Sequence, residues 1–234
     1  MKHGKNYVAS AKQVDAEQKY MPSEAVGLVK KAAFAKFDET VEVHFNLGID
    51  PRHADQLVRG TLMLPHGTGK DVRIVVLTTD DRAKDALAAG AIEAGSDELI
   101  EKISGGWLGF DIVIASPDIM SKVGRLGKTL GARGLMPSPK SGTVTPDVSK
   151  AVKEFMSGKQ EFRNDKTGIV HLVIGKVGFT DRQLKENFET VYSVIQKAKP
   201  TKAKGLYMKS IVMTSTMGPG VKVEQADNKW KEKS

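Results

Sequence analysis

The hydrophobic pattern changes type twice along the chain, and this change limits the folds that the chain can adopt. The segments TVEVHFNL (40–47) and IVHLVIGK (169–176) alternate apolar and polar residues. A period of two indicates strands with one face on a core and the other face open. The middle of the chain instead contains VRIVVLTTD (72–80) and FDIVIASPD (110–118), whose continuous apolar, β-branched runs are typical of strands covered on both faces.

Helical patterns alternate with these buried strands in the middle of the chain. We expect one helix from Asp81 to about Ala94, closed by Gly95, and another that Pro146 opens and that runs through Met156. Strands and helices in alternation predict a parallel sheet with helices on its faces.

The two ends of the chain carry helices beside their alternating strands. One helix is expected from Glu24, capped by Ser23, to about Ala35, and a second one, capped by Thr180 or Asp181, to about Lys199. The segments LVRGTLMLP (57–65) and LYMKSIVMTSTMG (206–218) read as further strands. The first and last parts of the chain therefore resemble each other and differ from the middle.

This pattern predicts a two-domain α/β fold. Residues 1–67 plus 159–234 form a discontinuous α+β domain made from both chain ends, and residues 68–158 form an inserted Rossmann-like parallel α/β domain. Glycine-rich segments, HGTGK (66–70) and SGK (157–159), lie at both crossings. We therefore expect a hinge at Gly67, Gly69 and Gly158.

The segment HGTGK also invites comparison with a nucleotide loop, which would make the chain an enzyme. A phosphate loop has the spacing G-x-x-x-x-G-K-[ST] and opens a helix. Here Leu64 stands at the first glycine position, Asp71 follows Lys70, and a strand-like run comes next. A near match at 127–129 fails in the same way, with Lys122 at the first glycine position. A hinge is the better interpretation of the first segment.

Other signs of catalysis or metal binding are absent from the sequence. The chain has no cysteine, which excludes disulfides and thiolate ligands, and none of its 5 histidines stands four residues from another. No Gly-x-Ser-x-Gly nucleophile motif occurs. We predict no catalytic residues, no metal and no cofactor.

Positive charge is concentrated in the last third of the chain. The net charge is +8, and residues 159–234, with 15 Lys and Arg against 8 Asp and Glu, carry +7 of it. The terminal KWKEKS (229–234) is partly a basic tail, but five lysines between 197 and 209 lie in sequence that looks folded. A basic block of this kind favours nucleic acid as a partner. Charge alone leaves both RNA and a DNA-binding repressor open.

Three segments carry residue types that suit RNA. EFRNDKTGIVH (161–171) has Arg163, Asn164, Lys166 and Thr167 in a turn before a strand, where cations meet phosphates and polar groups meet bases or 2′-hydroxyls. AKFDET (35–40) pairs Lys36 with Phe37, although a core role for this Phe is equally open. STMGPGV (215–221) ends a strand with Thr216, Met217 and Gly218, and it also reads as a plain turn.

These segments closely resemble the L-one family of bacterial large-subunit ribosomal proteins over nearly the whole chain. The resemblance is carried by AKFDETVEV, NLGIDPR, VRGT, LPHGTGK, FDIVIASPD, LGARGLMPSPKSGTV, FRNDKTGIVH, GKVGF and STMGPGV. It implies the two domains and the hinge described above. It also implies RNA contacts at Lys36, Phe37, Lys166, Thr167, His171, Thr216, Met217 and Gly218.

The same resemblance implies the partners of the chain. They are a helical junction in the stalk region of large-subunit rRNA, exit-site tRNA, the mRNA of the protein's own operon, and the rest of the large subunit. No apolar run reaches the ~20 residues that a membrane span needs, and the N-terminus has no signal-like apolar region. We therefore expect a cytoplasmic protein without a membrane segment.

Overall fold

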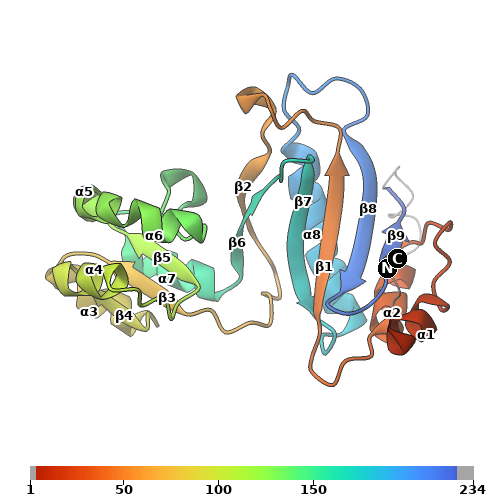
Figure 1. The fold of residues 1–234 in the computed structure, drawn as a ribbon, viewed down its shortest axis with the longest axis horizontal. Coiled ribbons are helices and arrows are strands. Elements are labelled where there is room, and N and C mark those ends of the chain that lie inside the picture. Colours follow the sequence, from red (N-terminus) through yellow and green to blue (C-terminus); the bar gives the residue numbers. More distant parts are fainter. Residues whose placement is uncertain (1–3, 226–234) are drawn as a thin grey trace. The chain divides into compact units, whose positions relative to one another are not determined.

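In the computed structural model, which describes residues 4–225, the chain divides into two compact units (Figure 1). The discontinuous unit contains the described residues up to Gly69 and those from Glu161 onward, and the inserted unit spans Lys70–Gln160. The predicted mixed α/β class, with one parallel sheet beside antiparallel pairing, is confirmed. The basic tail at 229–234 lies outside the described residues.

The discontinuous unit is built on a four-stranded antiparallel sheet with the order β7-β1-β8-β9. The strands are β1 (Thr40–Leu47), β7 (Ile169–Lys176), β8 (Met208–Ser215) and β9 (Val221–Val223). Strand β1 pairs with β7 on one side and β8 on the other, so segments from both chain ends share one sheet. In this register His44 lies opposite both His171 and Val212.

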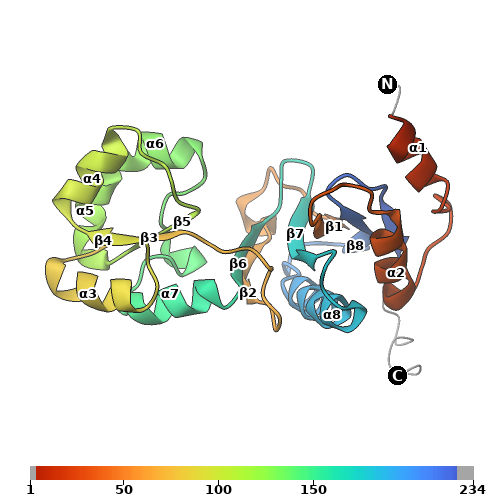
Figure 2. The same ribbon diagram turned by 90° about the horizontal axis from the view of Figure 1, so that it is seen from below.

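Alternation along the strands gives this sheet one covered and one open face. Val41, Val43 and Phe45 of β1 are buried in one core with Phe188 and Val191 of helix α8. That helix (Asp181–Lys197) lies along one face of the sheet, and α2 (Pro22–Ala32) packs into the same core (Figure 2). We call the opposite side the open face, and its residues are Glu42, His44, Asn46, His171, Val173, Ser210, Val212 and Thr214, none of them buried.

The helix boundaries differ in part from those expected. Helix α2 begins at Pro22, and the Met21 amide donates to the Glu24 carboxylate over 3.3 Å, so the predicted cap Ser23 lies inside the helix. The helix ends at Ala32 rather than near Ala35, because the next amides turn toward a buried carboxylate described below. Helix α8 has the predicted cap Thr180, whose hydroxyl accepts from the Gln183 amide.

A second, two-stranded sheet contains one strand from each side of the insertion. Strand β2 (Arg59–Met63) pairs with β6 (Lys159–Arg163) in a two-stranded sheet, and the second of these strands was not expected from the sequence. Helix α1 (Lys5–Ala11) and the short 3-10 turn η1 (Ala54–Gln56) complete the discontinuous unit.

The inserted unit has a three-stranded parallel sheet with the order β4-β3-β5. Its strands are β3 (Ile74–Leu77), β4 (Glu93–Gly95) and β5 (Ile112–Ala115). Its helices and 3-10 turns are α3 (Asp80–Ala88), α4 (Asp97–Ser104), η2 (Pro117–Ile119), α5 (Met120–Val123), η3 (Gly124–Leu126), α6 (Gly127–Ala132), η4 (Pro139–Ser141) and α7 (Val148–Met156).

Helices cover both faces of the parallel sheet. Figure 2 shows α3 and α7 on one side and α4, α5 and α6 on the other. Ile74 and Val76 belong to the core on the first side, whereas Val75 and Leu77 belong to the second. All four residues of β3 are therefore buried, as the continuous apolar run predicted.

One expected helix of the inserted unit was wrong. The helix predicted from Asp81 to Ala94 ends at Ala88, and Gly90 then adopts a φ of 112° that reverses the chain. Residues Glu93–Gly95 form an edge strand, β4, paired in parallel with β3.

Helix α7 begins at Val148, where the Asp147 side chain accepts from the Lys150 amide over 3.0 Å. Within residues 4–225 no helix is long and apolar enough to cross a bilayer.

Candidate nucleic-acid interface

A buried carboxylate organises one end of the antiparallel sheet. Glu39, just before β1, is 1% exposed, and its Oε1 accepts from the amides of Phe34 and Ala35 over 3.0 and 2.7 Å. Its Oε2 accepts from the Met217 amide over 3.0 Å. Burial raises the pKa of Glu39, but the hydrogen bonds from these amides help to outweigh it, and the pKa is lowered. The ionised carboxylate thus holds two loops together.

These two loops carry five of the predicted contact residues. Phe37 is 57% exposed and Met217 is 49% exposed, so the interpretation of Phe37 as a core residue is wrong. Thr216 is fixed through its hydroxyl, which accepts from the Thr40 amide over 2.9 Å. Gly218 packs so closely on Ser215 that an added Cβ would clash with the serine hydroxyl. We call Lys36, Phe37, Thr216, Met217 and Gly218 the loop cluster.

A second group of predicted residues lies in the turn that precedes the N-terminal end of strand β7, whereas the loop cluster lies near its C-terminal end. Asp165 Oδ1 accepts from the amides of Thr167 and Ile169, each over 2.8 Å. Burial raises the pKa of Asp165, but these bonds and the Thr167 hydroxyl outweigh it and hold the pKa well below its usual value. The turn is therefore rigid, and it leaves Arg163 and Lys166 exposed.

Asn164 does not belong to this exposed group, contrary to expectation. Its side chain is buried, and Oδ1 accepts from the Val58 amide over 2.8 Å while Nδ2 donates to the Asp165 carbonyl over 2.9 Å. The Asn164 side-chain amide therefore links the end of β6 to Val58 and to the turn, and it is not available to a ligand. We call Arg163, Lys166 and Thr167 the basic turn.

A histidine pair lies on the open face next to the basic turn. His44 and His171 lie opposite each other with 2.8 Å between their Nδ1 atoms, and His171 Nε2 lies 3.5 Å from Asp165 Oδ2. Strand β7 has 8 residues, which at ~3.3 Å per residue separates its ends by roughly 25 Å. The loop cluster is tied to the far end of β7, where the Val177 amide donates to the Glu39 carbonyl over 2.9 Å.

The histidine pair gives the fold a pH dependence. Burial lowers the pKa of His44 and His171 lowers it further, while Glu42 opposes the shift. The unfolded chain, with an ordinary pKa of 6.5, then binds more protons than the folded one, so this contribution to stability is lost as the pH falls below 6.5. We expect His44→Gln to reduce the fall in urea midpoint between pH 7.5 and 5.5. An unchanged pH slope in the variant would contradict this assignment.

The predicted hinge glycines have the backbone geometry that favours glycine. Gly67, Gly69 and Gly158 have φ values of 63°, 70° and 103°. Gly67 is nevertheless tied to helix α8, because its carbonyl accepts from Nδ2 of the buried Asn187 over 3.0 Å. A Cβ on Gly69 would lie 2.8 Å from the Phe179 ring. Residues 66–69 thus pack on the discontinuous unit, and the hinge stays a prediction.

Lys70, the lysine of the phosphate-loop comparison, is engaged within the inserted unit. Its Nζ lies 2.8 Å from Asp111 Oδ1, and Arg73 Nε lies 3.1 Å from Oδ2 of the same carboxylate. The hydrogen bond from Lys70 is the largest cause that lowers the pKa of Asp111 to about 2. This ion pair fits a structural lysine rather than a phosphate ligand. No group of three metal-ligating side chains occurs in the part of the chain that the structure describes.

The structure thus brings the predicted residues into two groups on one unit and adds residues that sequence reasoning missed. Glu39, Thr40 and His44 were not expected to shape the site, although each lies within or beside the segments that were singled out. In a comparison with protein families, the sequence model of the ribosomal protein L1p/L10e family matches residues 29–219. This range contains both groups and the whole inserted unit.

Proposed function

Because the chain belongs to the ribosomal protein L1p/L10e family, we propose that its discontinuous unit is the domain that grips the stalk region of large-subunit rRNA. Family membership makes the chain a large-subunit ribosomal protein that binds rRNA, in a family of structural RNA-binding proteins rather than enzymes. The observation that carries the proposal is the pair of preorganised groups, the loop cluster and the basic turn, near the two ends of β7 in the unit that holds most of the positive charge.

The chemistry of the two groups is complementary. Lys36, Arg163 and Lys166 contact phosphates, which give affinity without sequence preference. Phe37 and Met217 present exposed apolar surface to a base or ribose, and such stacking favours unpaired nucleotides at a junction. Thr216 is exposed and Gly218 has no side chain, so the chain can approach the RNA closely here. A folded RNA satisfies both groups at once, whereas a regular DNA duplex offers no unstacked base.

The finer roles are also part of the proposal. The inserted unit moves about the glycine segments at 67–69 and 158. It takes part in the movement and release of exit-site tRNA. The loop cluster and the basic turn also bind the mRNA of the protein's own operon, and this binding represses its translation. The family resemblance and the division of the chain into two units support these roles.

Salt dependence tests the proposed phosphate contacts. We expect the full chain to bind a stalk rRNA fragment at least a hundredfold more tightly than a DNA duplex of equal length, on the order of specific over non-specific binding. Replacing Lys36 or Lys166 with alanine should reduce the slope of log affinity against log salt by about 0.7–0.9 each. The measurement is a fluorescence binding titration from 50 to 300 mM KCl. Equal affinity for the DNA duplex would support the repressor alternative instead.

A further inference from the structure

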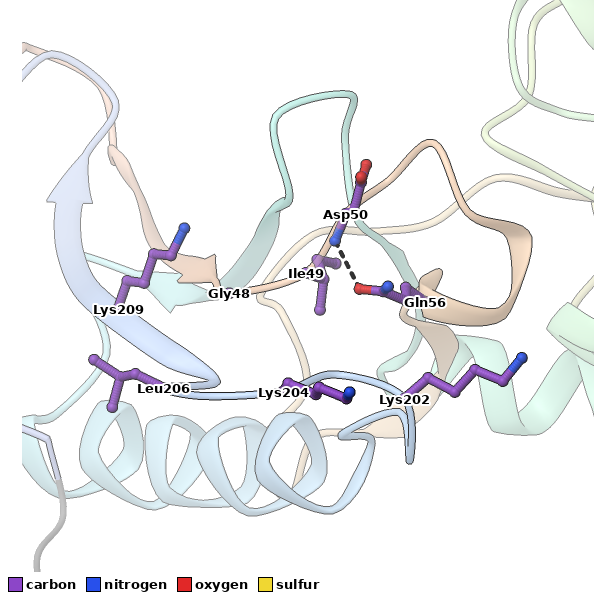
Figure 3. A pocket seen from close by; sticks show the side chains of 8 residues that line it. All are labelled: Gly48, Ile49, Asp50, Gln56, Lys202, Lys204, Leu206 and Lys209. Carbon is purple, nitrogen blue, oxygen red and sulfur yellow. Dashed lines mark hydrogen bonds between the residues drawn. The ribbon is translucent and has the colours of Figure 1, made fainter.

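An open pocket of about 640 Å³ lies at the end of the antiparallel sheet where β1 leaves it and β8 enters it. Figure 3 shows segment 48–50 facing the loop that carries Lys202, Lys204 and Leu206. Its lining residues are Gly48, Ile49, Asp50, Gln56, Lys202, Lys204, Leu206 and Lys209. All of them belong to the discontinuous unit, and none belongs to the loop cluster or the basic turn.

The pocket walls are fixed by backbone contacts. The Gly48 amide donates to the Tyr207 carbonyl over 2.6 Å, and an added Cβ at Gly48 would clash with the Leu206 carbonyl oxygen. Tyr207 anchors the loop at 202–206 to helix α8, because its hydroxyl donates to the Ile195 carbonyl over 3.0 Å. The Asp50 amide donates to Gln56 Oε1 over 2.9 Å (Figure 3). The shape of the pocket is therefore set before any ligand arrives.

Positive charge in the pocket is only partly balanced by carboxylates. Lys202 is paired, with its Nζ 2.6 Å from Asp55 Oδ2. Lys204 and Lys209 are exposed, and among residues 4–225 no ion pair involves either ammonium group. Asp50 also lines the pocket, and its Oδ1 accepts from the Arg52 amide over 3.0 Å, so its negative charge offsets part of the positive charge of the three lysines. Two lysines with no carboxylate partner among residues 4–225, beside this pocket, favour an anion.

The pocket lies beside Gly168, which directly follows the basic turn in the chain. The Leu47 amide donates to the Gly168 carbonyl over 3.0 Å, and a Cβ on Gly168 would lie 3.3 Å from Ile49 Cγ1. Ile49 lines the pocket, so the turn and the pocket share a wall. On the other side, Leu206 is 67% exposed. A free phosphate would leave this apolar surface uncovered, whereas a phosphodiester with its ribose would cover it.

We propose that this pocket is a further RNA-binding site, which takes the sugar-phosphate backbone of the strand that continues past the basic turn. Lys204 and Lys209 contact its phosphates, and Ile49 and Leu206 contact its ribose. The proposal rests on the proposed function, because it assigns a third point of contact to the same RNA.

The test compares full-chain variants on a stalk rRNA fragment that retains its flanking helices. K204A/K209A is expected to bind about tenfold more weakly at low salt and to reduce the salt slope by about 1.4–1.8, as two lost phosphate contacts should. The matched control is K84A/K128A, which removes two exposed lysines from the inserted unit. Urea midpoints of both variants confirm that they fold. Affinity and slope equal to those of the control would overturn the proposal.

A second measurement needs no mutation and separates the two ideas. Bound rRNA should protect Lys204 and Lys209 of the wild-type chain from acetylation while Lys84 and Lys128 stay reactive, and full reactivity of the first pair would refute the pocket site. If the wild-type chain fails to bind the rRNA fragment, the proposed function fails. If it binds through Phe37 and Met217 but the pocket lysines have no effect, only the pocket assignment fails.

Discussion

Replacing Glu39 with glutamine is expected to loosen the loop cluster and to weaken RNA binding together. The carboxylate accepts from three amides, those of Phe34, Ala35 and Met217, at 2.7–3.0 Å, and it is 1% exposed. A glutamine keeps the size but turns an NH₂ group toward at least one of these donors. A buried donor left without an acceptor costs about 1–3 kcal/mol. The variant should therefore unfold at a lower urea concentration than the wild type.

The same substitution should lower rRNA affinity by roughly tenfold or more. In the variant the two loops must become ordered on binding, and a cost of about 1.4 kcal/mol for this ordering corresponds to a factor of ten in affinity. The matched control is Glu161→Gln, which makes the same chemical change at an exposed position of the same unit. Unfolding by urea and a binding titration measure the two effects. Wild-type stability in the Glu39 variant would show that the carboxylate does not hold the loops.

The role of Glu39 shows where sequence reasoning stops. The segment AKFDET drew attention to Lys36 and Phe37 through residue type alone. Whether Phe37 enters the core or stays exposed depends on the bend at 33–39, which is stabilised by a carboxylate whose other partner, Met217, is 178 positions away. No local pattern encodes such a contact. The exposure of Phe37 therefore depends on a contact between two distant segments and could not be predicted from the local sequence.

The strands illustrate the same contrast. Alternation in 40–47 predicted the buried residues of β1, because burial on one face of a sheet imposes a period of two on the sequence. Residues Glu93–Gly95 have low strand propensity and form β4 only because β3 offers them a parallel partner. Likewise, the lysines between 197 and 209 were visible as charge. Three of them, Lys202, Lys204 and Lys209, line a pocket whose walls approach closely because Gly48 has no side chain.

The largest effect on RNA binding alone is expected from the exposed apolar residues of the loop cluster. Phe37→Ala combined with Met217→Ala removes two side chains that are 57% and 49% exposed, so stability should change little. Base stacking on an aromatic side chain such as Phe37 contributes about 1–3 kcal/mol per base. We therefore expect the double variant to lose roughly tenfold to a hundredfold in affinity for the stalk rRNA fragment, with a nearly unchanged salt slope, because no phosphate contact is removed.

This combination of lower affinity and constant slope distinguishes the apolar contacts of Phe37 and Met217 from the proposed phosphate contacts of lysines such as Lys36 and Lys166, whose alanine substitutions lower both. Met63→Ala is the matched control, since Met63 is 51% exposed and lies on β2 of the same unit. Titrations at several salt concentrations measure affinity and slope for each variant, and urea unfolding checks their stability. If the double variant binds the fragment as tightly as Met63→Ala does, Phe37 and Met217 do not contact RNA, and the basic turn must carry recognition by itself.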